Sequence, residues 1–220
     1  MIYAVFRAGV RLIAWVILGR RLHIEGMENV PRSGPVLVVG NHVGNVEPPL
    51  TGVHIPRLDV YYMAKVELFR PAFIGWLFRR NHTFPVVRHT ADRAALRQAL
   101  RVLHEGHVLL VYPEGTRSWA GETSAPLGGA GFIARHSGAP IVPVASWGSD
   151  KVIPRGAWIP RRADVHLRIG PAFTLPERAA DGRRLDNQQA SEYMMARVTA
   201  LLPGGPAEPP AQARDRSPAA

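Results

Sequence analysis

The stretch "VLVVGNHVGNVEPPL", residues 36–50, ends a run of branched apolar residues with a histidine and places an acid five positions later. The apolar run is typical of a buried strand, and the two prolines after Glu47 suit the first turn of a helix. A carboxylate on one ring nitrogen fixes the tautomer of a histidine and leaves the other nitrogen free to accept a proton. We therefore interpret His42 and Glu47 as candidate catalytic residues, although the pattern alone also fits a structural histidine beside a helix cap.

A second polar loop follows another apolar run, in the segment "HVLLVYPEGTRSW", residues 107–119. Loops at the carboxyl ends of neighbouring parallel strands meet at one edge of a sheet, where ligands bind. A planar guanidinium there suits a phosphate monoester. The loop offers a carboxylate, a glycine that allows close backbone approach, a hydroxyl and a guanidinium, from Glu114, Gly115, Thr116 and Arg117. Two such loops after two buried strands predict one shared site.

Short apolar runs alternate with helix-like segments along most of the chain. This alternation predicts an α/β fold, with a mostly parallel central sheet of about six to seven strands flanked by helices. Strands are expected at residues 36–40, 60–64, 83–87, 107–112, 141–145 and 165–169. Helices are expected at residues 48–54, 71–80, 91–105, 127–136 and 190–202, with Thr90 as the cap of the third.

The composition narrows the possible chemistry. The chain has 220 residues, no cysteine and a formal net charge of +10. Without cysteine, a disulfide, a cysteine nucleophile and a thiolate metal site are excluded. A strongly basic surface favours anionic partners such as anionic lipids or phosphorylated substrates. Nucleic acid is not expected, because the arginines are scattered and no nucleic-acid recognition module is evident.

Three regions are expected along the chain. Residues 1–21 are apolar but carry Arg7 and Arg11, and we expect a helix that lies in a membrane interface with both arginines toward the headgroups. An amphipathic helix packed on the domain is the alternative. Residues 22–202 form the globular domain, and residues 203–220, rich in proline, glycine and alanine, are expected to be a disordered tail.

Four ordered blocks of the sequence resemble the glycerophospholipid acyltransferases, especially the 1-acyl-sn-glycerol-3-phosphate (lysophosphatidate) acyltransferases. The blocks are "NHVGNVE" (41–47), "AKVELFRPAFIGWLFRRNHTFPVVR" (64–88), "YPEGTRS" (112–118) and "GAPIVPVA" (138–145), and the resemblance spans about residues 22–175. Two positions depart from the family pattern. Glu47 stands where the family usually has aspartate, and Gly44 stands where it often has serine.

The resemblance implies direct acyl transfer without an acyl-enzyme. His42 would be the general base that takes the proton of the acceptor hydroxyl as its oxygen attacks an acyl thioester, and Glu47 would orient His42. The co-substrate would be acyl-CoA or acyl carrier protein. No metal or other cofactor is expected.

The resemblance also assigns the substrate-binding residues. Arg117 would bind the phosphate of the acceptor, with Arg88 and Lys65 as second contacts. Gly115 and Thr116 would shape their loop and offer backbone donors to the oxyanion, and Glu114 would hold that loop in place.

The function implied is transfer of a fatty acyl group to the sn-2 hydroxyl of lysophosphatidic acid, giving phosphatidic acid, as a step of phospholipid biosynthesis. Glycerol-3-phosphate, another lysolipid or a lyso-aminolipid are alternative acceptors, because acceptor choice depends on pocket shape. Two rival functions are a catalytically silent lipid-binding protein, marked by Glu47, and a hydrolase in which His42 activates water. The expected location is an anionic membrane surface, on the cytoplasmic face of the cell membrane.

Overall fold

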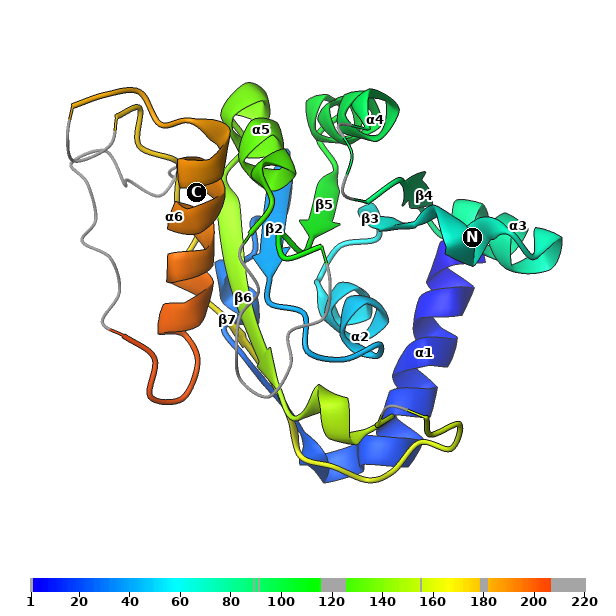
Figure 1. Ribbon diagram of the computed structural model, residues 1–220. Helices are drawn as coiled ribbons and strands as arrows, with labels where there is room; N and C mark the ends of the chain where they lie inside the picture. Colours follow the sequence, from blue (N-terminus) through cyan, green and yellow to red (C-terminus); the bar gives the residue numbers. More distant parts are fainter. Residues whose placement is uncertain are drawn as a thin grey trace.

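The computed structural model describes residues 2–88, 90, 92–115, 126–154, 156–178 and 182–206. Within these residues a seven-stranded sheet forms the centre of the molecule, in the order β1-β7-β6-β2-β5-β3-β4 (Figure 1). The strands are β1 (Leu22–Glu25), β2 (Val36–Gly40), β3 (Val60–Lys65), β4 (Thr83–Val86), β5 (Val108–Val111), β6 (Ile141–Trp147) and β7 (Val165–Ile169). Strands β2 to β6 are parallel, β7 is antiparallel to β6, and β1 is parallel to β7. The predicted α/β fold with a mostly parallel sheet is confirmed.

Six α-helices accompany the sheet in the described part of the chain. They are α1 (Ile2–Leu18), α2 (Glu47–His54), α3 (Ala72–Arg80), α4 (Arg93–His104), α5 (Gly128–Ser137) and α6 (Asn187–Ala200). The predicted strands and helices are all present, with ends shifted by at most three residues. Strand β1 was not expected, although its partly buried Leu22 and Ile24 alternate with exposed His23 and Glu25 as in a half-buried strand; at four residues the pattern is short and easily missed.

The sheet is covered on both faces. Alternate residues of β2 serve the two faces: Val36 and Val38 pack with residues of α1 and α2, whereas Leu37 and Val39 pack with residues of α4, α5 and α6. All five residues of β2 are buried. A continuous apolar run is typical of such a central parallel strand.

The cap of α4 differs from the prediction. Asp92, not Thr90, accepts hydrogen bonds from the backbone N–H groups of Ala94 and Ala95. The hydroxyl of Thr90 donates instead to the carbonyl of Val87. A carboxylate is a stronger acceptor for the free N–H groups of a helix than a hydroxyl, which explains the preference.

Helix α1 is partly packed on the domain and partly exposed. Tyr3, Ala14 and Leu18 are buried, and the hydroxyl of Tyr3 lies 3.0 Å from that of Tyr62. The segment Ile2–Arg21 is long and apolar enough to cross a membrane, by length and composition only. The location of residues 1–21 in a membrane interface stays a prediction. The expected tail lies mostly outside the described residues, which end at residue 206.

The direction predicted for Arg7 is wrong. Its guanidinium donates to the carbonyl oxygens of Val53 and Arg57, at 2.7 and 2.8 Å, and so faces the domain rather than solvent or headgroups. Val53 belongs to the last turn of α2, where backbone carbonyls lack partners within the helix. Burial lowers the pKa of Arg7 below its usual value, and the neighbouring Arg11 contributes in the same direction. Arg11 itself is exposed.

The parallel strands all end at one edge of the sheet. The loop with His42 follows β2, Lys65 is the last residue of β3, Arg88 comes two residues after β4, and Glu114 follows β5. The fifth parallel strand, β6, leads into a short 3₁₀ turn that begins at Ser149. This edge therefore gathers polar side chains from segments far apart in the sequence, as parallel sheets do at their ligand sites.

Candidate active site

The imidazole of His42 and the carboxylate of Glu47 are in direct contact. Nδ1 of His42 lies 3.0 Å from Oε2 of Glu47, and both side chains are buried. Glu47 is the first residue of α2, so the loop of residues 41–46 folds back on the start of the helix that it enters. Because an ionised carboxylate only accepts hydrogen bonds, Nδ1 carries the proton and Nε2 keeps its lone pair.

Glu47 is held by three further groups. The backbone N–H of Val43 donates to both of its carboxylate oxygens, at 3.0 and 2.8 Å. Two hydroxyls from the end of β6 and the turn after it donate to Oε1, from Ser146 at 3.3 Å and from Ser149 at 2.5 Å. The side chain of Glu47 is 0% exposed. A buried carboxylate needs such partners, because an unpaired one would be strongly destabilising.

Asn41 fixes the histidine loop to strand β6. Its side-chain amide donates to the carbonyl of Ser146 and accepts from the N–H of the same residue, both at 2.8 Å. Asn41 is 2% exposed. These two bonds join Asn41 to the backbone of β6 in the way that neighbouring strands are joined. They therefore fix the position of the next residue, His42.

Tyr112 supports the other side of the imidazole. Its ring lies 4.8 Å from the ring of His42, centroid to centroid, at an angle of 34°. Gly40 makes room for it, because a Cβ at residue 40 would come within 3.0 Å of the tyrosine ring. Burial, and after it the charge of Glu47, raise the pKa of Tyr112 well above its usual value. The phenol therefore stays neutral beside the histidine.

The histidine loop also depends on Gly44. A Cβ at residue 44 would lie 3.0 Å from backbone atoms of Ser149 and Asp150. The loop and the turn after β6 therefore touch backbone to backbone. This close approach favours glycine at residue 44.

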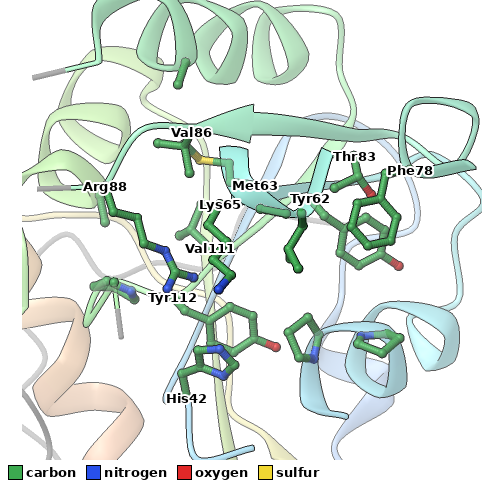
Figure 2. A pocket seen from close by; sticks show the side chains of 18 of the residues that line it. His42, Tyr62, Met63, Lys65, Phe78, Thr83, Val86, Arg88, Val111 and Tyr112 are labelled. Atoms are coloured by element: carbon green, nitrogen blue, oxygen red, sulfur yellow. The ribbon is translucent and has the colours of Figure 1, made fainter. Parts of the chain in front are cut away.

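A large cavity opens in front of His42. Its volume is about 1770 Å³, well above the 300–1,000 Å³ typical of small-ligand sites. Lys65, Arg88 and Gly115 also line it. Figure 2 shows the side chains of Lys65 and Arg88 pointing into the same space, next to His42 and Tyr112. Two cations beside a histidine make this end of the cavity suitable for an anionic group.

The other walls of the cavity are mainly apolar. They come from α1, α2, α4 and α5 and include Phe6, Val10, Ile17, Leu50, Leu96 and Ile133. The cavity thus has a cationic end beside His42 and is otherwise apolar. It suits a molecule with an anionic head and a hydrocarbon chain.

The second predicted loop is only partly within the described residues. Glu114 is buried at 2% exposure and is not among the residues that line the cavity, and its role in holding the loop stays a prediction. Gly115 has φ of +62°, a value that favours glycine, and its N–H donates to the carbonyl of Tyr112 at 3.1 Å. That N–H is therefore occupied and does not offer the oxyanion donor that the sequence suggested. Thr116 and Arg117 lie outside the described residues.

Some residues of the site escaped the sequence reasoning. Asn41 and Tyr112 open the blocks "NHVGNVE" and "YPEGTRS" but were given no role there, and Ser146 and Ser149 lie outside every quoted block; all four surround the pair of His42 and Glu47. A weak signal exists, because Ser146 and Ser149 closely follow the "GAPIVPVA" block. Over the described ranges, no group of three or more acidic or histidine side chains is placed to hold a metal ion. The expectation that no metal or cofactor is needed stays a prediction.

The sequence is similar to known acyltransferases. The family model described as "Acyltransferase" matches residues 21–147. A 1-acyl-sn-glycerol-3-phosphate acyltransferase of Bacillus subtilis (strain 168) is 34% identical over 136 residues, which cover 60% of this chain and 67% of the relative. Another, of Borreliella burgdorferi, is 23% identical over 202 residues, which cover 91% of this chain and 75% of the relative.

A solved structure is also similar. It is the crystal structure of the 1-acyl-sn-glycerophosphate (LPA) acyltransferase, PlsC, from Thermotoga maritima, which is 27% identical with a TM-score of 0.63. The match covers 79% of this chain and 67% of that one.

Proposed function

The chain belongs to the acyltransferase family, and on this premise we propose that it transfers a fatty acyl group to the sn-2 hydroxyl of lysophosphatidic acid, giving phosphatidic acid. The observation that carries the proposal is the contact of 3.0 Å between His42 and Glu47 at the cationic end of an otherwise apolar cavity. The names of the relatives support the choice of acceptor.

His42 is the proposed general base. The hydroxyl of the acceptor gives its proton to Nε2 while its oxygen forms a bond to the carbonyl carbon of the thioester. The tetrahedral intermediate then breaks its C–S bond, and the leaving thiolate takes the proton from the imidazolium. The products are an ester and a free thiol, and His42 returns to its neutral form. The negative charge of Glu47 stabilises the imidazolium in between.

The phosphate of the acceptor is proposed to bind at the cationic end of the cavity. Lys65 and Arg88 line this end, and Arg117 is the third expected contact. A phosphate there would place the glycerol hydroxyl next to His42. The hydrocarbon chains of acceptor and donor would then occupy the apolar part. The donor is an acyl thioester, of CoA or of acyl carrier protein.

We also propose that the enzyme works on a membrane, at its cytoplasmic face. One side of α1 is exposed and apolar, with Leu12, Trp15 and Val16 each at least 60% exposed. Other side chains of the same helix line the cavity, so a lipid could pass between the membrane and the site along one element. The net charge of +10 favours an anionic surface.

A product assay tests the proposal. Purified protein is incubated with lysophosphatidic acid and an acyl thioester of either carrier, and phosphatidic acid and free thiol are measured together. Equal amounts of both products support the proposed transfer. Free fatty acid without diacyl product would instead indicate hydrolysis with His42 acting on water, and lipid binding without turnover would indicate a silent lipid-binding protein.

A panel of acceptors identifies the substrate. Glycerol-3-phosphate, other lysophospholipids and lyso-aminolipids are compared with lysophosphatidic acid under the same conditions. Preference for a phosphate monoester is expected if Lys65 and Arg88 bind it. A higher kcat/KM on a neutral acceptor would overturn the proposed acceptor but leave the chemistry in place.

A further inference from the structure

The connection between β6 and β7 carries two apolar side chains that nothing covers in this structure. Trp158 is 94% exposed and Ile159 is 78% exposed, the two highest values among the exposed large apolar residues described. Most large aromatic side chains are at least partly buried. A fully exposed tryptophan next to an exposed isoleucine therefore indicates a surface that binds another molecule.

The structure of this connection holds the two side chains outward. The N–H of Arg161 donates to the carbonyl of Val152 at 2.8 Å, which closes the segment between them into a loop. Val152 and Ala163 are buried, at 3% and 8%, and anchor the two ends of the loop in the domain. The exposed residues therefore lie at the tip of an anchored loop.

This loop and α1 line the same cavity. Val152, Ile153 and Pro160 of the loop and Ala14, Ile17 and Leu18 of α1 are among its lining residues, and Ile17 packs in one apolar cluster with Val152 and Ile153. Figure 1 shows the β6–β7 connection, in yellow-green, extending past the C-terminal end of α1 to the side of the molecule opposite α6. Each of these two segments, far apart in the sequence, also carries an exposed tryptophan: Trp15 is 70% exposed and Trp158 is 94% exposed.

Charge favours an anionic bilayer as the partner. Arg161 and Arg162 follow the apolar tip after one residue, Pro160, and are both exposed. A tryptophan and an aliphatic residue beside two arginines have the composition of a segment that lies at a membrane interface, with apolar side chains below the headgroups and cations among their phosphates. The charges match anionic phospholipids.

We infer that residues 157–162 form a second membrane contact, in which Trp158 and Ile159 insert into an anionic phospholipid bilayer. This inference rests on the proposed membrane-bound function. If α1 were the sole contact with the membrane, the domain could rotate about the axis of that helix. A second contact, in a loop that also lines the cavity, fixes that rotation, so that the cavity stays turned toward the headgroup layer from which lysophospholipid and product exchange.

A fluorescent label tests the insertion directly. The chain has no cysteine, so Ile159→Cys creates a single thiol that takes an environment-sensitive dye such as NBD. The matched control is Glu192→Cys, an exposed position on α6. With vesicles of phosphatidylglycerol and phosphatidylcholine, the dye at residue 159 is expected to shift to shorter wavelength and to be quenched by doxyl-labelled lipids. The control dye should show neither effect. A dye at residue 159 that stays in water while the protein cosediments with the vesicles would overturn the inference.

A double variant measures the contribution to binding. Trp158→Ser/Ile159→Ser is expected to weaken partitioning to the same vesicles about tenfold or more, since two large apolar side chains no longer enter the bilayer. Circular dichroism checks its fold. Transfer to a water-soluble short-chain acceptor should persist, and transfer to acceptor in vesicles should fall. If the double variant partitioned like the parent, the second contact would be contradicted and the acyltransferase proposal would stand. If the parent protein itself transferred no acyl group to either acceptor, the proposed function would be contradicted instead.

Discussion

The hydroxyl of Ser149 lies 2.5 Å from the carboxylate of Glu47, although 102 residues separate them in the chain. Glu47 in turn contacts His42 at 3.0 Å. The position of the imidazole therefore depends on the turn after β6 as well as on its own loop. The site is one hydrogen-bonded unit built from two distant segments, and substitutions in either segment should affect it.

Replacement of His42 is expected to abolish most of the activity. His42→Ala removes the proposed base and should lower kcat by about 100- to 10,000-fold, with the fold retained because the side chain lies at the cavity surface. Formation of phosphatidic acid and the unfolding temperature are measured side by side. The control is His104→Ala, an exposed histidine at the end of α4, which should behave like the parent. A folded His42→Ala protein within tenfold of the parent would refute the assignment.

The charge of Glu47 should matter for both activity and stability. Glu47→Gln keeps the size of the side chain but places an NH₂ group where Val43, Ser146 and Ser149 also donate. At Oε2 the new NH₂ would face the N–H groups of His42 and Val43, and at Oε1 the serine hydroxyls would have to turn and accept from it. Either way the hydrogen bonds to a charged acceptor are lost, which costs about 1–3 kcal/mol in the free energy of unfolding. We expect kcat to fall at least about tenfold with little change in KM, because Glu47 contacts the base and not the substrate. Glu28→Gln, at an exposed position, is the control.

The contribution of Ser149 is predicted to be smaller. Ser149→Ala removes one donor from a buried carboxylate and should lower the free energy of unfolding by about 1.5–3 kcal/mol, the range for hydrogen bonds to charged groups. Denaturant unfolding measures this change, and Ser137→Ala, whose hydroxyl makes only long contacts of 3.3 and 3.5 Å, is the comparison. Equal stability of both variants would show that the bond to Glu47 contributes no more than the long contacts of Ser137.

Lys65 and Arg88 are expected to act on phosphorylated acceptors. Lys65→Ala or Arg88→Ala should raise KM for lysophosphatidic acid by about tenfold or more, since a charged hydrogen bond is lost, and should affect a neutral monoacylglycerol much less. Steady-state kinetics on both acceptors provides the comparison. Arg101→Ala, an exposed arginine on α4, is the control for a general loss of positive charge. An equal effect on both acceptors would argue against phosphate binding at this position.

Gly44 and Gly9 form a matched pair of substitutions. Gly44→Ala adds a Cβ 3.0 Å from the backbone of Ser149, so the histidine loop has to move and both kcat and the unfolding temperature should fall. Gly9→Ala adds a Cβ in α1 with no atom within 4 Å. It should be neutral or stabilising by about 0.5–1 kcal/mol, because alanine favours the helix. If Gly44→Ala were equally harmless, the close approach of the two segments would be unimportant.

The features that could be predicted from the sequence are those with a local pattern. The apolar run of β2 and the prolines of α2 were enough to place His42 in a loop and Glu47 at a helix start. The strands after them follow the same rule, since each is a short apolar run bounded by polar residues. The ends of these elements shift because competing caps decide them, as Asp92 does at α4.

Features that depend on tertiary contacts could not be predicted in this way. No local pattern shows that Ser149 donates to Glu47, or that Arg7 turns toward the carbonyls of Val53 and Arg57. These contacts exist only in the folded chain and leave no periodic pattern in the sequence. Strand β1 is a different case, because its four residues do alternate between partly buried and exposed, but so short a run gives a weak signal until its partner β7 is known.

Helix α1 has a consequence for how the protein is prepared. A researcher seeking a more soluble protein would remove it first, because of its long, exposed apolar side. Yet Phe6, Val10 and Ile17 form part of the wall of the cavity that contains His42. A chain without α1 would therefore have an active site that is open to bulk water along one side. Low activity of such a preparation would reflect the loss of these cavity residues and not the activity of the intact protein.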